Sequence, residues 1–173
     1  MNGFLLLIPF LLVRFGLLAL LDREAVGRAA HFAPMSGGEI PAYWVYQIST
    51  AAIFIYLCFC KIAVLPLWLF GAGLAVYLLG LLACGASIVS FAAPSGGGPL
   101  TKGVYRFSRN PMYGAYFLLF LGCALLTQSP ALGGIVLVFQ ISAHWIILAE
   151  ERWCLERFGD AYRQYMDRVR RYL

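Results

Sequence analysis

The residues with the clearest potential for chemistry lie in the polar stretch 98–116, which reads GPLTKGVYRFSRNPMYGAY. Asn110 is a favoured residue immediately before a helix, and Pro111 suits the first helical position because the N–H there has no partner. The free amides of that first turn, next to Arg109, would make a natural site for an anion. The stretch therefore predicts a site for the acidic part of a nucleotide-like cofactor. The alternative is a well-capped membrane helix preceded by an arginine.

A second group of polar side chains lies later in the chain. Gln140, His144 and Glu151 are spaced four and then seven residues apart, so on a helix they share one face. A charge near the bilayer centre costs ~2.5–3.5 kcal/mol, so this face should border protein or a wet cavity. We predict Gln140 and His144 as candidates on the substrate side, with hydrogen bonding between helices as the alternative. Glu150 and Glu151 at the end of a helix would oppose its dipole, which favours a specific partner such as Arg109 or a bound ligand.

The composition indicates which kind of molecule must position these groups. Of the 173 residues, 62% are hydrophobic and only 12% are charged, and the mean hydropathy is +0.80. A water-soluble domain with this balance would expose large apolar patches. We therefore predict a single integral membrane domain spanning 1–173, with no separate soluble catalytic domain. The five cysteines show neither a disulfide framework nor the spacing of metal ligands, so we predict no metal site.

Apolar runs divide the chain into membrane-length pieces. Five of them are near bilayer length, at about 4–21, 43–64, 67–91, 113–127 and 131–149. The fold class is accordingly all-α and polytopic, with about five transmembrane helices. Only Leu65 and Pro66 separate the second and third segments, and only 128–130 separate the fourth and fifth, so both pairs are predicted to form tight helical hairpins. The Gly- and Pro-rich stretch 92–112 between the hairpins is the predicted cytosolic cofactor loop.

The C-terminal segment 150–173 has the pattern of an amphipathic helix. Its apolar and aromatic residues recur at spacings of three and four, at Leu155, Phe158, Tyr162, Tyr165, Val169 and Tyr172. Gly159 and Asp160 could interrupt and recap this helix. We predict that it lies on the membrane surface or folds back over the site.

The distribution of basic residues predicts the orientation. Most of the basic residues fall on one side of a five-helix topology, whereas Lys61 lies on the other. Those on the first side are Arg23, Arg28, Lys102, Arg106, Arg109 and the six arginines of the C-terminal segment. By the positive-inside rule the basic side faces the cytosol, so the N-terminus is predicted outside and the C-terminus inside a cytoplasmic or inner membrane. Arginines facing anionic lipid headgroups also account for the net charge of +5. We therefore expect membrane lipids, and no nucleic acid, as partners.

Two further features have simpler interpretations. Arg14 interrupts the first apolar segment, and we interpret it as a snorkelling side chain or the mark of a shorter, shifted helix rather than as a functional group. Tyr43, Trp44 and Tyr46 are interpreted as an interfacial aromatic belt. His31 has no evident partner.

Two motifs together resemble the superfamily of isoprenylcysteine carboxyl methyltransferases and phospholipid methyltransferases, which are membrane enzymes. The first is LTKGVYRFSRNPMY at 100–113, and the second is EERWCLERFGDAYRQY at 150–165. Their order, their separation and the intervening hairpin all match the family, from about Pro94 onward. Asn110 stands where the eukaryotic prenylcysteine enzymes have a histidine, and Gly97 stands where they have another. Both departures argue against a prenylcysteine as the specific substrate.

The resemblance implies S-adenosylmethionine as cofactor and a lipophilic small molecule or lipid, entering from the bilayer, as methyl acceptor. It further implies that Arg109 and Glu150 are catalytic. The cofactor pocket that it implies is built from Leu100, Gly103, Tyr105, Arg109, Asn110, Pro111, Tyr113, Glu150 and Glu151.

Two other classes of function are compatible with the sequence. One is an NADPH-dependent membrane reductase of the sterol-reductase type, whose C-terminal region looks somewhat similar. The other is a non-catalytic membrane scaffold with the same architecture. Binding of S-adenosylmethionine, of NADPH or of neither would separate the three.

Overall fold

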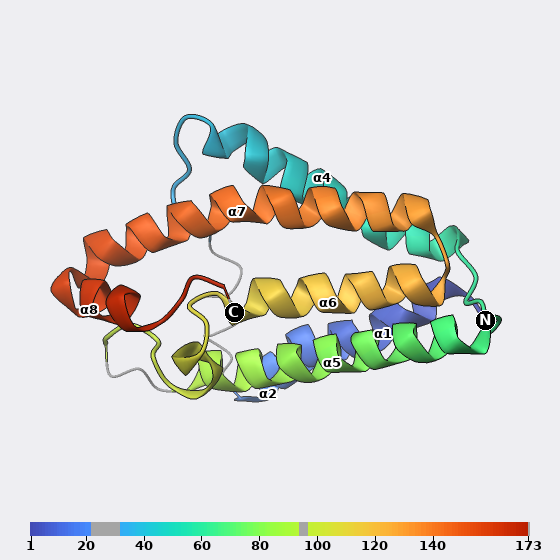
Figure 1. Cartoon of the computed structure of the whole chain (residues 1–173). Helices are drawn as coiled ribbons and strands as arrows, with labels where there is room; N and C mark the ends of the chain where they lie inside the picture. Colours follow the sequence, from blue (N-terminus) through green and yellow to red (C-terminus); the bar gives the residue numbers. More distant parts are fainter. Residues whose placement is uncertain (22–31, 94–96, 173) are drawn as a thin grey trace.

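The computed structural model describes residues 1–21, 32–93 and 97–172, and the regular elements in these ranges are helices (Figure 1). Four are long and apolar enough to cross a membrane, namely the continuous helix Gly3–Leu21, α4 (Glu39–Phe59), α5 (Leu67–Ala92) and α7 (Pro130–Phe158). The first comprises η1 (Gly3–Leu6), α1 (Leu7–Leu11), η2 (Leu12–Leu17) and α2 (Leu18–Leu21). A shorter apolar helix, α6 (Pro111–Leu126), a short turn, η3 (Gly103–Arg106), and α8 (Asp160–Arg168) complete the chain. The predicted all-α, polytopic membrane fold is confirmed. Arg23, Arg28 and His31 lie outside the described residues.

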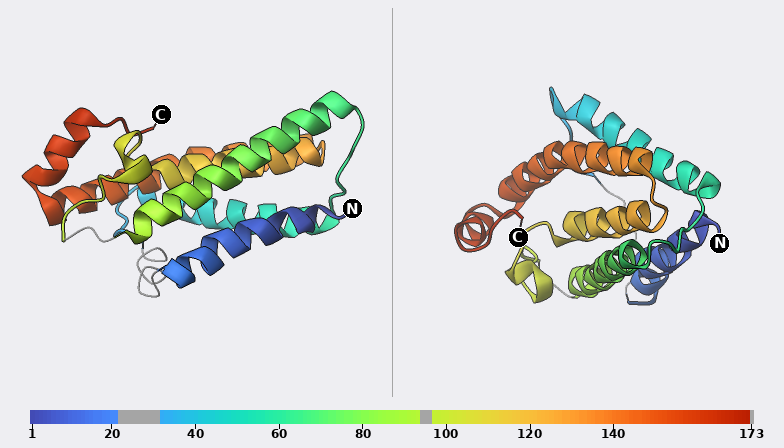
Figure 2. Two further views of the ribbon diagram at one scale, coloured as in Figure 1. Left: turned by 90° about the horizontal axis from the view of Figure 1, so that it is seen from below. Right: turned by 45° about the vertical axis from the view of Figure 1, so that its right-hand side comes forward.

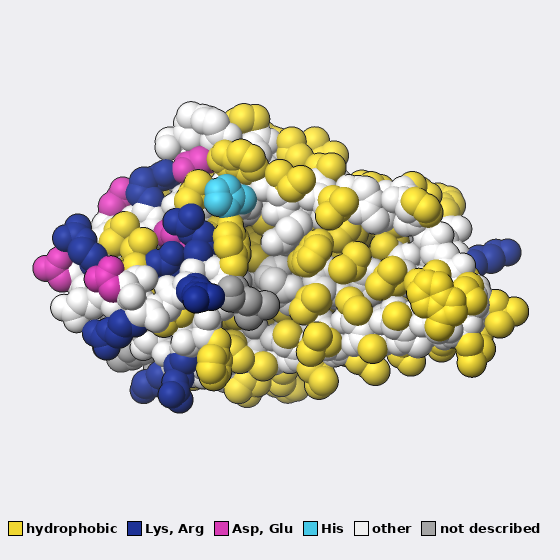
Figure 3. Space-filling model, viewed as in Figure 1, with side chains coloured by type: hydrophobic (Ala, Val, Ile, Leu, Met, Phe, Trp, Pro, Cys, Tyr) yellow, Lys and Arg dark blue, Asp and Glu magenta, His cyan; other side chains and the backbone are white. Residues whose placement is uncertain are grey.

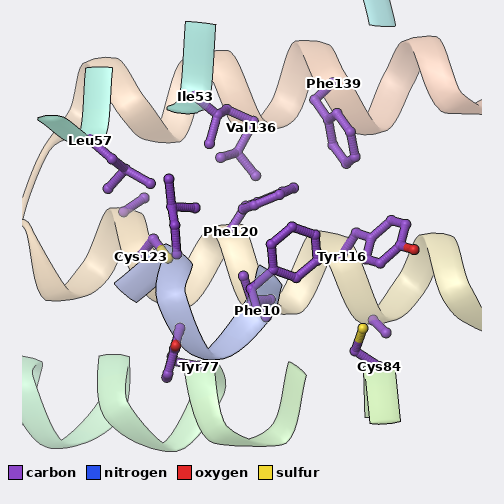
Figure 4. Close-up of a cluster of buried hydrophobic side chains, with 14 of the residues drawn as sticks. Phe10, Ile53, Leu57, Tyr77, Cys84, Tyr116, Phe120, Cys123, Val136 and Phe139 are labelled. Carbon is purple, nitrogen blue, oxygen red and sulfur yellow. The ribbon is translucent and has the colours of Figure 1, made fainter. Parts of the chain in front are cut away.

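The helices pack around α6, which runs through the middle of the bundle (Figure 1). α5 packs along α6 and α4 packs along α7, while the second half of the first helix lies against α5 (Figure 2). Figure 4 shows the resulting core, in which the ring of Phe10 in α1 meets Tyr116 and Phe120 of α6 edge to face, with centroids 5.6 and 5.5 Å apart. Phe10 also reaches Phe54 of α4. The N-terminal helix is therefore an integral part of the core.

Two glycines allow α5 and α6 to approach closely. A Cβ atom at Gly80 would lie 2.3 Å from the backbone nitrogen of Leu119, and one at Gly122 would lie 2.5 Å from that of Tyr77. Small residues at such crossings let helix backbones come into van der Waals contact, which is one of the forces that drive association between helices in lipid.

Gly80→Ala is therefore expected to destabilise the protein by at least ~1–3 kcal/mol, because the added methyl group collides with backbone rather than with a flexible side chain. Thermal unfolding in detergent measures the effect. Gly71→Ala is the matched control on the same helix, since nothing lies within 4 Å of the added methyl group, and alanine is the better helix former. Equal unfolding temperatures for the two variants would contradict the close α5–α6 contact.

The predicted hairpin between the second and third segments is wrong. α4 ends at Phe59 rather than near residue 64, and the chain continues as an extended linker, 60–66. Cys60 C=O accepts a hydrogen bond from Gly3 N–H at 2.8 Å, and Ile62 N–H donates to Met1 C=O at 2.9 Å. Because the linker pairs with the N-terminus, α4 and α5 separate and pack against different partners. At its other end α4 begins at Glu39, four residues earlier than predicted.

The predicted boundary between the fifth segment and the C-terminal helix is also wrong. α7 continues through residue 150 to Phe158, because nothing interrupts it before Gly159, whose φ is +53°. Glu150 and Glu151 therefore lie inside α7 and not at its C-terminus. The separate C-terminal helix, α8, begins only at Asp160, and it folds back toward the start of α6 (Figure 1).

The surface has an apolar part, suited to contact with lipid, and a charged part, suited to contact with water. Figure 3 shows hydrophobic side chains along the length of the bundle, with most of the charged side chains in view gathered at the end that carries α8 and one basic side chain at the opposite end. Large apolar side chains such as Leu20, Trp68 and Leu82 are more than two-thirds exposed in the isolated chain, as expected for lipid-facing positions.

Candidate active site

A cavity of about 990 Å³ opens at the charged end of the bundle. This volume lies at the upper end of the range typical of small-molecule sites. Its wall combines the loop before α6, the first turns of α6, the C-terminal part of α7 and α8. The end of α5, one residue of α4 and one residue of the N-terminal helix also contribute to it. The lining includes Arg14, Tyr46, Leu100, Tyr105, Arg109, Asn110, Met112, Tyr113, Tyr116, Glu150, Glu151, Trp153, Cys154, Arg157, Phe158, Tyr162 and Tyr165.

Glu151 joins three segments of this wall. Its carboxylate is only 4% exposed and lies 3.2 Å from Arg109 Nε and 2.9 Å from the guanidinium of Arg171. Asn110 Nδ2 donates a third contact to it at 3.2 Å. Because a buried charge is costly unless it is paired and hydrogen-bonded, this cluster holds the loop, α7 and the C-terminal segment together.

The backbone of the C-terminal segment reinforces the cluster. Arg109 N–H donates to the carbonyl of Arg170 at 3.0 Å, and Asn110 Nδ2 donates to the carbonyl of Arg171 at 3.3 Å. The side chain of Asn110 therefore connects the loop to α7 and to the C-terminal segment. It makes no capping bond to α6, although Asn110 does precede the helix and Pro111 does begin it.

Glu150 has a different environment, although it is the neighbour of Glu151. Its carboxylate accepts a hydrogen bond from the hydroxyl of Tyr113 at 2.7 Å. The ring of Tyr113 in turn meets Tyr46 edge to face, with centroids 6.3 Å apart. Glu150 thus presents an acidic group beside an aromatic part of the cavity wall.

The loop before α6 is anchored through η3. Tyr165 of α8 donates a hydrogen bond to the carbonyl of Tyr105 at 2.6 Å, and the N–H of Val104 donates to Ser90 Oγ at 3.2 Å. Burial raises the pKa of Tyr105, with Glu150 as a secondary cause, and burial raises the pKa of Tyr165 to about 12. Both side chains are therefore neutral phenols at physiological pH, suited to packing and hydrogen bonding rather than to proton transfer.

Most of the predicted cofactor residues meet at this cavity. Those on its wall are Leu100, Tyr105, Arg109, Asn110, Tyr113, Glu150 and Glu151, whereas Gly103 and Pro111 are not among its lining residues. Gly103 has a φ of +61°, and a Cβ atom there would lie 2.1 Å from Ser90 Oγ. Close packing of the loop against α5 therefore favours glycine at position 103. Pro111 is the first residue of α6.

Gly103→Ala is expected to displace η3 and the loop, because the substitution adds a collision to a left-handed backbone that costs alanine ~1–2 kcal/mol. Ser90→Gly removes the atoms that collide. Gly103→Ala should therefore lower the unfolding temperature less when it is introduced into the Ser90→Gly variant than when it is introduced into the unaltered protein. No recovery in this thermal unfolding comparison would show that the strained φ, and not the contact with Ser90, requires glycine.

The predicted substrate-side candidates are not at the cavity. Gln140 and His144 share a face of α7 with Glu151, but neither lines the cavity. His144 Nδ1 instead hydrogen-bonds the hydroxyl of Tyr172, and Gln140 Oε1 is buried without a hydrogen-bond partner among the described residues. The C-terminal segment covers part of the face that the helical spacing had suggested for a substrate.

Two interpretations from the sequence need correction here. Tyr46 does not belong to an exposed aromatic belt, since it is 7% exposed, stacks on Phe139 with centroids 4.7 Å apart and lines the cavity. Arg14 does not simply snorkel to the surface, since it lines the cavity and its guanidinium carbon lies 5.9 Å from the ring centroid of Tyr116. The sequence does contain a signal for the position of Arg14, namely an arginine inside an apolar segment.

A family model for phospholipid methyltransferase matches residues 63–161, which include α5, the loop, α6 and the whole of α7. The match covers more than half of the chain and both acidic residues of the cavity. The chain belongs to the phospholipid methyltransferase family. It is therefore a member of the superfamily of integral membrane methyltransferases that the two motifs resemble. The phospholipid methyltransferase family acts on membrane lipid-type substrates. No curated protein and no solved structure matches the chain.

Proposed function

We propose that this protein transfers a methyl group from S-adenosylmethionine to a lipophilic or membrane-embedded acceptor, and that the cavity is its active site. The observation that supports this function is the meeting of Arg109, Glu150 and several aromatic rings on the wall of one cavity, within a chain of the phospholipid methyltransferase family. Residues far apart in the sequence, from the N-terminal helix to α8, contribute to that wall.

The chemistry of the wall fits the proposed cofactor. S-adenosylmethionine has a carboxylate, an ammonium, a sulfonium and an adenosyl group. Arg109, beside the start of α6, provides a cation for the carboxylate, and Glu150 provides an anion for the ammonium. Tyr105 and Tyr113 provide aromatic faces for the adenosyl or sulfonium part, where cation–π contact contributes ~0.5–2 kcal/mol. When bound, the cofactor supplies an electrophilic methyl group on its sulfonium.

The residues of the chain then act mainly by alignment. Methyl transfer is an in-line displacement, and holding two reactants in line can account for ~7–11 kcal/mol of barrier lowering. Glu151 and Asn110 hold the loop that carries Arg109, while Tyr113 holds the carboxylate of Glu150. The aromatic walls exclude water from the reacting groups.

We assign the cavity to the cytosolic side of the membrane. Lys102, Arg106, Arg109 and the arginines from Arg152 onward lie at the end that carries the cavity, whereas Lys61 lies in the linker at the other end. By the positive-inside rule this charged end faces the cytosol. The donor would then enter from the aqueous phase and the acceptor from the bilayer.

Titration calorimetry of the protein in detergent, with S-adenosylmethionine and with NADPH in turn, tests the choice of cofactor. Binding of the first alone is expected. Binding of NADPH alone would contradict the proposal and support a reductase. Binding of neither compound would support a non-catalytic scaffold.

Incubation of the purified protein with radiolabelled S-adenosylmethionine and total membrane lipids tests the acceptor. We expect label in an extracted lipid fraction, and the labelled species identifies the acceptor. Glu156→Gln, an exposed change on α7, should label lipids as the unaltered protein does. Label in no lipid-soluble species, with donor binding intact, would overturn the lipophilic acceptor.

A further inference from the structure

Arg14 has an unusual position for a charged residue. It belongs to the membrane-crossing helix Gly3–Leu21, which lies outside the stretch matched by the family model. The helix is wound as a π-helix over Leu12–Leu17, a deviation that is rare and often found at functional sites. An ionisable side chain inside a membrane helix is costly to insert and is commonly tied to a substrate or ion.

Arg14 lies deeper along the cavity wall than the groups assigned to the donor. It contacts the ring of Tyr116, which is five residues into α6, or about 7.5 Å along the helix axis from Pro111. Arg109 and Asn110 precede α6, so they lie at the aqueous end of the same wall. An arginine at this depth is placed for a ligand that reaches the cavity from the membrane.

The hydroxyl of Tyr116 supplies an independent observation. Tyr116 is 8% exposed and lines the cavity, and its hydroxyl is buried without a hydrogen-bond partner among the described residues. Figure 4 shows this hydroxyl directed away from Phe10 and Phe120. A buried hydroxyl left unpaired costs free energy that a ligand atom can recover. Arg14 and Tyr116 together offer a cation and a hydroxyl donor at one point of the wall.

The charges of the wall separate into two regions. Among the described lining residues, Arg109 is paired with Glu151, and Glu150 hydrogen-bonds Tyr113. Arg157 lies over the ring of Trp153, 5.2 Å from its centroid. Of the lining residues that the structure describes, Arg14 is the cation that the N-terminal helix contributes.

We propose that Arg14, assisted by the hydroxyl of Tyr116, binds an acidic oxyanion group of the methyl acceptor. The acceptor would then be an amphiphile that carries a phosphate or a carboxylate, held with its acid at Arg14 and its reactive atom toward the donor end of the cavity. This inference rests on the proposed function, and Arg14 acts as a positioning and specificity residue.

Binding of simple amphiphiles tests the inference without turnover. Dodecyl phosphate, dodecanoate and dodecanol are each titrated into the full-length protein in a neutral maltoside detergent, with tryptophan fluorescence as readout, because Trp153 lines the cavity. We expect at least one of the two acids to bind, and Arg14→Gln to weaken its binding by about ten-fold or more, as expected for loss of a charge-assisted hydrogen bond. Arg14→Lys should retain part of the affinity, Tyr116→Phe should lose less than Arg14→Gln, and dodecanol should bind all variants equally.

The controls separate this inference from the proposed function. Arg163→Gln, an exposed change on α8, should bind every probe as the unaltered protein does. Removing a charge from a membrane helix favours insertion, so Arg14→Gln should fold, and thermal unfolding checks this. Affinity for S-adenosylmethionine should be unchanged in Arg14→Gln. Acid binding that is unchanged, or lost equally with dodecanol binding, would overturn the role of Arg14, whereas failure of the donor to bind the unaltered protein would overturn the proposed function itself.

A preference between the two acids identifies the oxyanion. Binding of dodecyl phosphate alone supports a phosphate-bearing acceptor, and binding of dodecanoate alone supports a carboxylate. Binding of neither acid to the unaltered protein would contradict the inference.

Discussion

Glu150→Gln is expected to weaken S-adenosylmethionine binding and turnover by roughly ten- to a hundred-fold while leaving the fold intact. The change removes the negative charge but keeps an oxygen that can accept the hydrogen bond from Tyr113. A hydrogen bond to a charged group contributes ~1.5–3 kcal/mol, and each 1.4 kcal/mol corresponds to a factor of ten in affinity. Titration calorimetry with the donor and the labelled-methyl assay measure the two effects.

Two further variants serve as comparisons in this experiment, Tyr113→Phe and Glu156→Gln. Tyr113→Phe removes the hydroxyl that holds Glu150 but keeps its charge and the aromatic ring, so a smaller loss of donor affinity is expected. Glu156→Gln changes an exposed carboxylate on the same helix and should have no effect. Glu150 is a clearer probe than Arg109, because Arg109 is buried against Glu151 and its removal would also disturb the fold. Full donor affinity in Glu150→Gln would refute its assigned role.

The largest loss of stability at the site is expected for Glu151→Ala, at ~3–5 kcal/mol. The change leaves the guanidinium of Arg109, which is 8% exposed, buried without its carboxylate, and breaking a buried ion pair has this cost. Arg171 is about one-third exposed, so its share of the loss is small. Denaturation in detergent measures the loss, and Glu156→Ala is the matched control on α7.

The same variant should release the C-terminal segment. Arg171 is held by Glu151 and Asn110, and Arg170 by the N–H of Arg109. Without Glu151 the segment loses its buried anchor, so trypsin should cleave after Arg168, Arg170 and Arg171 faster than in the Glu156→Ala control. Unchanged cleavage together with unchanged stability would show that Glu151 is not the centre of the cluster.

Much of the candidate site could be read from local sequence, because its residues occur in two short motifs. Arg109, Asn110 and Tyr113 are within five positions of one another, and Glu150 and Glu151 are adjacent. The punctuation of Asn110 and Pro111 correctly locates the start of α6. Spacing, however, does not say which side chain caps a helix and which crosses to another segment, and Asn110 does the latter.

The helical pairing could not be read in the same way. The short connection at Leu65-Pro66 suggested a hairpin, but hydrogen bonds between the linker and the N-terminus separate α4 from α5. Gly71 and Gly80 are equivalent in sequence on one apolar helix, yet only Gly80 meets the backbone of α6. Such contacts depend on which helices are neighbours, a property of the whole bundle.

What the sequence by itself determined is the solvent and the chemical groups: apolar runs of bilayer length require membrane helices, and the two motifs supply the acidic, basic and aromatic residues. Only the tertiary structure decided which of those residues face one cavity. It added Arg14, Tyr46 and Tyr116 to the wall, and it left Gln140 and His144 outside. The physical reason is that helical periodicity specifies the face on which a side chain lies, whereas packing against distant segments decides what that face meets.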